Sequence, residues 1–191
     1  MNFPHPLRIS LLSLALATGL AARPALAQQP PEVMESLNSL AQERATHTSF
    51  TFDKSELQFA ERFIDSGHDG EAKRAVAALD AITVENYHYT RPAFYDPEVM
   101  DSIIARYRVA GWKHLVNANA HPGEGVTTDV WLHFHGSEID DLTVLVRGQR
   151  EMNLIAVSGA LRPLDLVHLS GHFGIPKVDQ NAVMVPAPDG K

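Results

Sequence analysis

The chain has 191 residues, of which 45% are hydrophobic, and its 23 acidic and 16 basic residues give a net charge of −7. An acidic surface repels nucleic acids and anionic membranes, so neither is expected as a partner. The absence of cysteine excludes a disulfide framework, a cysteine nucleophile and the lipid-modified cysteine of a lipoprotein.

The first 27 residues have the character of a secretory signal peptide. Arg8 precedes an apolar run, and Ala25-Leu26-Ala27 places small residues at both outer positions of a cleavage site. Arg23 interrupts the run, and a charge at membrane depth is costly, which argues against an uncleaved anchor. We therefore expect cleavage after Ala27 and a periplasmic or secreted protein without a stable membrane anchor.

Residues 28–46 are expected to form a polar leader and a short helix, because Val33, Leu37 and Leu40 recur at helical spacing. The next run alternates Phe50 and Phe52 with small polar residues, which indicates a strand with one buried face.

Two helices are predicted next. Asp53 and Glu56 have the spacing of a capping box, so a helix begins after Asp53 and continues to Gly67. A second helix starts at Asp69 and places Ala72, Ala75, Val76 and Leu79 on one face.

The chain then alternates like a strand over residues 82–89. Asp96-Pro97 is a strong helix start, with Asp at the N-cap and Pro at the first helical position, and Gly111 is the expected C-terminal cap. A strand over residues 112–117 follows.

The stretch from Thr127 to Leu169 is expected to hold the centre of the sheet. Strands are predicted at residues 130–135, 142–147 and 154–157, the last apolar on both faces and therefore central. Asp140-Asp141 is assigned to a turn, where Asp is favoured. Pro163 opens a short helix.

These elements predict an α+β fold with a single, mostly antiparallel sheet of about five to six strands and helices packed on one face. The domain is expected to span residues 47–175, and residues 176–191 to form a flexible tail because they are rich in Pro and Gly and lack periodicity.

Four segments resemble a family of exported bacterial proteins of unknown function called DUF4252. They are FDKSELQFAERFI, AITVENYHYT, RYRVAGWKHLV and NLIAVSGALRPLDLVHL. The resemblance implies an exported α+β domain over most of the chain after the signal peptide. It implies no activity, cofactor or catalytic residue.

A metal site is one hypothesis for the chemistry of the chain. His133 and His135 lie two residues apart on a predicted strand, so both side chains project to the same side and can converge on one ion such as Zn²⁺. Asp129 on that face could add a carboxylate, and Glu85 or His88 a further ligand. A solvent-facing strand that carries these residues for solubility alone is the other interpretation.

An aromatic platform is the second hypothesis. If Trp131 and Tyr87 share an uncovered sheet face with His133 and His135, they form a binding surface for another envelope protein. Burial under a helix is the alternative. No catalytic or cofactor motif is visible, so we expect a non-enzymatic binding or accessory protein of the cell envelope without a cofactor, with a metal-binding protein or metal-assisted hydrolase as the alternative.

Overall fold

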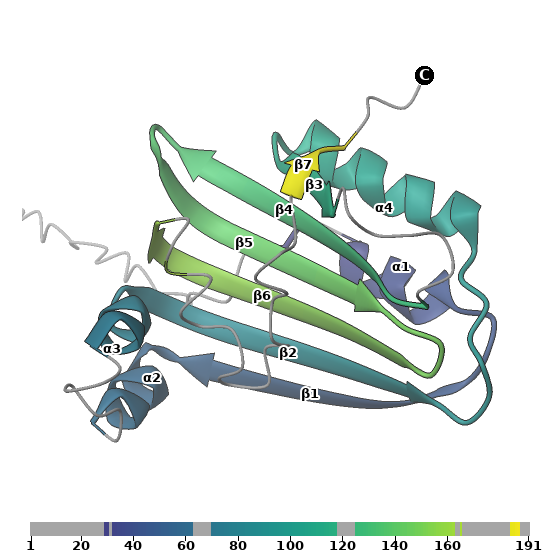
Figure 1. The fold of residues 1–191 in the computed structure, drawn as a ribbon, viewed down its shortest axis with the longest axis horizontal. Helices are drawn as coiled ribbons and strands as arrows, with labels where there is room; N and C mark the ends of the chain where they lie inside the picture. Colours follow the sequence, from purple (N-terminus) through teal and green to yellow (C-terminus); the bar gives the residue numbers. More distant parts are fainter. Residues whose placement is uncertain are drawn as a thin grey trace, which may run out of the picture.

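The computed structural model describes residues 29–30, 32–62, 70–117, 125–162, 165 and 184–187. Helices and strands are interspersed in the first half of the chain, and strands follow one another in the second (Figure 1). The elements are α1 (Val33–Leu40), β1 (Ala45–Asp53), α2 (Lys54–Glu61), α3 (Gly70–Ala77), β2 (Leu79–Tyr89), α4 (Pro97–Val109), β3 (Lys113–Asn117), β4 (Thr127–His135), β5 (Glu138–Arg147), β6 (Glu151–Leu161) and β7 (Met184–Pro186).

Two helices begin where the side-chain caps predict. The Asp53 carboxylate accepts hydrogen bonds from the backbone N–H groups of Ser55 (2.8 Å) and Glu56 (3.0 Å), and the Glu56 carboxylate accepts from the N–H of Asp53, which confirms the capping box. The Asp96 side chain caps α4 by accepting hydrogen bonds from the N–H groups of Glu98 and Val99, with Pro97 in the first turn.

The strands form one antiparallel sheet in the order β1-β2-β6-β5-β4-β3-β7. The central position predicted for residues 154–157 is confirmed, because β6 lies between β2 and β5. A strand with both faces apolar needs cover on both sides.

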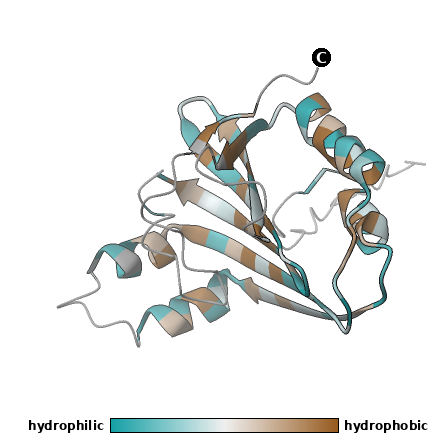
Figure 2. Ribbon diagram, turned by 45° about the vertical axis from the view of Figure 1, so that its right-hand side comes forward, coloured by the Kyte–Doolittle hydropathy of each residue, from teal (hydrophilic) through white to brown (hydrophobic). Residues whose placement is uncertain are grey.

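Two core clusters provide that cover. One face packs against α1 and α4, with Leu37 and Ile103 over Trp131 and Leu154. The other face packs against α2 and α3, and includes Leu57. The two helix pairs lie toward opposite ends of the sheet, and brown apolar bands face the sheet from each pair (Figure 2). We call the sheet face that packs against α1 and α4 the α1/α4 face.

The sheet therefore confirms the α+β class, with seven strands where five to six were expected and helix pairs on two faces where one was expected. The strand β7 corrects the expectation of an unstructured tail, because Met184–Pro186 pairs with β3. The helix expected to continue to Gly67 ends earlier, at Glu61, with Arg62 as its C-cap. The start of the helix expected at Asp69 and the residue Pro163 lie outside the described residues. No helix in the described ranges is long and apolar enough to cross a membrane.

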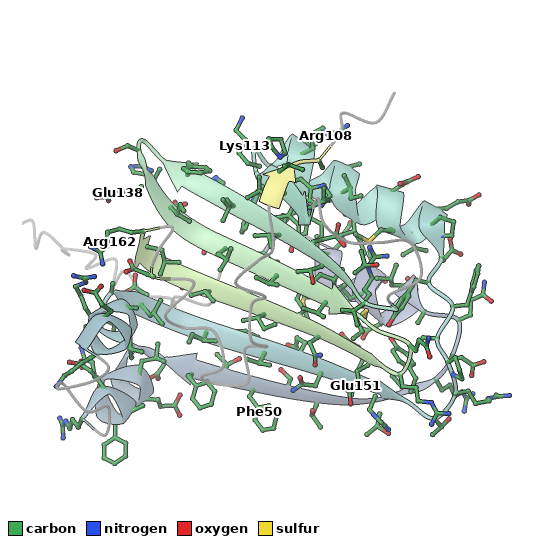
Figure 3. The ribbon with its side chains drawn as sticks, viewed as in Figure 1. Phe50, Arg108, Lys113, Glu138, Glu151 and Arg162 are labelled. Carbon is green, nitrogen blue, oxygen red and sulfur yellow. The ribbon has the colours of Figure 1, made fainter. Side chains whose placement is uncertain are left out.

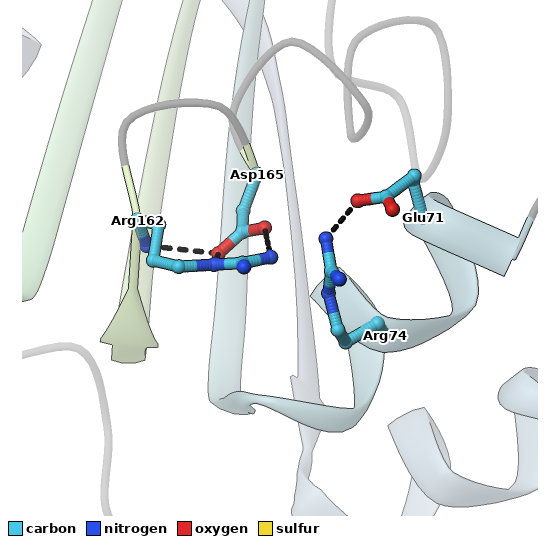
Figure 4. A network of polar contacts seen from close by, with 4 residues as sticks. All are labelled: Glu71, Arg74, Arg162 and Asp165. Carbon is cyan, nitrogen blue, oxygen red and sulfur yellow. Dashed lines mark hydrogen bonds and ion pairs between the residues drawn. The ribbon is translucent and has the colours of Figure 1, made fainter.

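An ion pair between Arg162 and Asp165 fixes the chain just after β6, and α3 lies beside this pair (Figure 4). The Arg162 guanidinium donates two hydrogen bonds to the Asp165 carboxylate, 2.7 and 3.1 Å long. These bonds lower the pKa of Asp165, against the opposing effect of its burial. Arg74, paired with Glu71 on α3, adds positive charge nearby and lowers it further.

Candidate metal centre

Three polar side chains lie in one row across β4, β5 and β6. His133 pairs with Asp141, and Asp141 pairs with Ser158. Directly opposed residues of antiparallel strands project to the same side of a sheet. His133 is two residues from Trp131, so the row lies on the α1/α4 face, toward the end of the sheet where Glu138 and Arg162 are labelled in Figure 3.

A β-bulge adds a second carboxylate to this row. The register of β5 shifts between Ile139 and Asp141 against both neighbouring strands, which leaves Asp140 as an extra, unopposed residue. A bulge bends the strand and redirects a side chain. The Oδ1 atom of Asp140 consequently lies 2.7 Å from Nδ1 of His133.

The result is a set of one imidazole and two carboxylates. Ligand atoms of His133, Asp140 and Asp141 all lie within 4.8 Å of one another, and the three side chains are half-buried. Two ligands of one zinc ion lie no more than about 4.4 Å apart, since each zinc–ligand bond is about 2.0–2.2 Å long. A small adjustment of the side chains would therefore bring all three onto one ion.

Ser158 supplies independent evidence that the row accommodates a further group. Its side chain is only 9% exposed, and its Oγ atom has no hydrogen-bond partner among the described residues. Buried hydroxyls are nearly always bonded to protein or to an ordered ligand. An ion with its coordinated water beside Asp141 would satisfy this atom.

Trp112 forms one wall of the cluster. Its ring centroid lies 5.4 Å from that of His133, and its side chain is buried at the end of α4. Gly111, with a φ of 85°, turns the chain from α4 into β3 and places Trp112 there. An apolar wall limits water on that side of the ligands and strengthens their electrostatic interaction with a cation.

Asp129 does not join His133 and is engaged elsewhere. Its buried carboxylate accepts hydrogen bonds from His114 (2.9 Å) and Arg147 (2.8 Å). Burial works to raise the pKa of Asp129, but the bonds and charges of His114 and Arg147 outweigh it, and the pKa lies below its usual range.

His135 does not join the cluster either. It lies at the end of β4 with an exposed side chain, opposite Glu138. The structure therefore does not bring together the expected ligand set of His133, His135 and Asp129. It brings His133 together with Asp140 and Asp141. The assignment of these two residues to a turn was wrong, because β5 begins before them, at Glu138.

Trp131 and Tyr87 do not form an exposed platform. Trp131 is 1% exposed, stacked between Tyr107 at 4.4 Å and His114 at 4.8 Å. Tyr87 is buried, stacks on His47 and donates to Asn38 on α1, and burial raises its pKa to about 12. The helices α1 and α4 cover this part of the face.

The residues considered as further ligands also lie apart from the cluster. The buried Glu85 carboxylate is bound by His47 (2.6 Å) and Ser49 (2.7 Å) on β1, and His88 is exposed.

The sequence carries one signal for the missed bulge. Ile139 and Leu142 are three residues apart, yet both are buried in the same core cluster. In a regular strand they would face opposite sides. The pattern Ile-Asp-Asp-Leu therefore indicates an extra residue in the strand, where the turn propensity of Asp suggests a loop.

Comparison with known proteins adds no functional assignment to this geometry. The chain matches no protein-family model, no curated protein and no solved structure, so the resemblance to DUF4252 stays a prediction.

Proposed function

We propose that this protein is an exported metal-binding protein that holds a divalent transition-metal ion between His133, Asp140 and Asp141. The observation that carries the proposal is the convergence of three ligand atoms, from two strands and a bulge, within 4.8 Å of one another. Export rests on the signal-peptide character of residues 1–27.

The donor set favours particular ions. One imidazole nitrogen and two carboxylates suit Zn²⁺ or Mn²⁺, whereas an all-oxygen set would favour Mg²⁺ or Ca²⁺. The two carboxylates of Asp140 and Asp141 neutralise a divalent charge. Three protein ligands also leave at least one coordination position for water or for a ligand of the metal.

An alternative function, capture of an envelope protein on an aromatic platform, has less support. Trp131 and Tyr87 are buried beneath α1 and α4, so neither is available to a partner.

Titration calorimetry with Zn²⁺ and Mn²⁺, on protein purified without a histidine tag, tests the proposal. We expect one ion per chain, and at least a tenfold loss of affinity in each of His133→Ala, Asp140→Asn and Asp141→Asn. His135→Ala and Asp101→Asn are matched controls, because these exposed residues lie outside the cluster, and both should bind as the parent does.

Binding well below one equivalent would remove the proposal. So would an isotherm that His133→Ala and Asp140→Asn leave unchanged, because the ion would then be held elsewhere. Circular dichroism of each variant separates loss of ligands from loss of fold.

A further inference from the structure

The strand β1 is an outer strand of the sheet. Among the described residues, its nine residues, Ala45–Asp53, pair with β2 alone, so one edge has no strand beside it. All six residues from 46 to 51 are exposed. In Figure 1 β1 forms the lower margin of the sheet, α2 lies at its left end, and no strand is drawn below it.

This edge lacks the features that normally prevent edge-to-edge pairing. Residues 45–52 contain no Lys, Arg or Pro, and the register with β2 runs without a bulge. Natural proteins usually protect an edge strand with one of these features or by making it very short. The opposite edge has such protection, because β7 is three residues long and ends at Pro186.

Apolar side chains are exposed along the same edge. Phe50 is 53% exposed and projects from the margin of the sheet (Figure 3). Phe59 on α2 is 59% exposed and, together with Phe52, lines a shallow hollow beside β1. A free backbone edge flanked by exposed aromatic side chains is suited to the addition of a strand.

We infer that two copies of this chain associate through β1, antiparallel about a two-fold axis at Phe50. A two-fold interface requires a self-complementary surface. With Phe50 opposite its own copy, Thr48 faces the partner's Phe52, and His47 faces the partner's Asp53. The arrangement therefore pairs two exposed aromatic rings at the centre of the interface.

Neighbouring registers pair the aromatic rings differently. An axis at Ser49 places Phe50 opposite Thr48 and separates the rings. An axis at Thr51 places Phe50 opposite the partner's Phe52. Phe50 is exposed whereas Phe52 is half-buried, so the pairing of Phe50 with its own copy favours the axis at Phe50.

A second copy fits this edge better than an oppositely charged partner does. The chain carries a net charge of −7, whereas residues 45–52 contain no Asp, Glu, Lys or Arg. Two copies can approach along this neutral strand with less repulsion than elsewhere on the surface. The metal cluster is separated from β1 by β2 and β6, so the two inferences are independent.

Sedimentation and light scattering on the full chain, over a range of concentrations, test the pairing. We expect a reversible dimer, and Phe50→Lys should raise its dissociation constant about 100-fold or more by placing two like charges on the axis. Phe134→Lys is the matched control, because this exposed aromatic residue lies on β4, and it should dimerise as the parent does.

Single cysteines determine the register, because the chain contains none of its own. Phe50→Cys should give a disulfide-linked dimer on mild oxidation, and Thr46→Cys should not, since it is far from its own copy across the axis. A monomer at all concentrations, a dimer insensitive to Phe50→Lys, or linkage at Thr46 as efficient as at Phe50 would overturn the inference.

Discussion

The indole of Trp131 lies flat against the imidazole of His114, with ring centroids 4.8 Å apart and ring planes within 9° of each other. Tyr107 covers the other face of the indole. Through this stack the strand β3 and helix α4 are held on β4. His114 is in turn hydrogen-bonded to Asp129, whose carboxylate also pairs with Arg147. The aromatic stack is therefore anchored by a buried carboxylate.

Asp129→Asn should lower the free energy of unfolding at pH 7 by about 3 kcal/mol, because it leaves the half-buried Arg147 without its counter-charge. The pKa of Asp129 is lowered in the folded state, so its contribution is complete above the ordinary carboxyl pKa and is lost as pH falls through the folded value. Urea unfolding of parent and variant at pH 7 and pH 3 measures this.

The difference between the two proteins should therefore shrink at pH 3. The exposed Asp101→Asn is the control and should be neutral at both values. A difference that is equally large at pH 3 would contradict the electrostatic origin.

Trp131→Ala should destabilise the fold by about 3–5 kcal/mol, because it removes a fully buried side chain from between two rings. Thermal unfolding followed by circular dichroism measures the loss. Trp131→Phe should cost much less, since the indole Nε1 has no hydrogen-bond partner among the described residues. An alanine variant as stable as the parent would show that this part of the sheet is open.

Gly159→Ala tests the contact between β6 and the start of β2. A Cβ at this position would lie 2.4 Å from the Ala78 carbonyl oxygen, and the φ of 145° is unfavourable for other residues. We expect a loss of about 2–3 kcal/mol from overpacking and backbone strain. Gly70→Ala in α3, where a Cβ meets nothing within 4 Å, should be neutral or stabilising in the same denaturation assay. Equal stability of the two variants would contradict the contact.

Ni²⁺ should quench the fluorescence of Trp112, whose ring lies 5.4 Å from that of His133. The chain has only two tryptophans, so Trp112→Phe leaves Trp131 as the reporter, and the quenching should fall sharply. Lowering the pH from 7 to 5 should weaken the effect, because imidazole and carboxylates bind metal only when deprotonated. Quenching that persists in His133→Ala would place the ion away from this cluster.

Local signals in the sequence predicted the parts of the fold that local interactions determine. The Asp53–Glu56 capping box and the Asp96-Pro97 helix start both use groups within one turn of the chain. The apolar character of β6 on both faces likewise predicted its interior position.

Features that depend on distant segments were missed. Trp131 is buried because α4 covers it, and β7 forms because it pairs with β3, which is remote in sequence. The position of Asp140 and Asp141 depends on a bulge, where the turn preference of Asp conflicts with the pairing of β5 between two strands. Only one of the three candidate ligands, His133, was therefore identified, because alternation along a regular strand does not account for an extra residue.

The strand order also has a kinetic consequence. The strands β4, β5 and β6 are joined by short connections, so their contacts are local and can form early. The strand β2 completes the sheet by pairing with β6, which joins residues as remote as Tyr87 and Met152. Closing so long a loop costs entropy before any contact compensates for it, so the docking of β2, with β1 attached, is expected to limit the folding rate. Until β2 docks, one edge of the apolar strand β6 is exposed, and a newly made chain can aggregate through this edge before that late step.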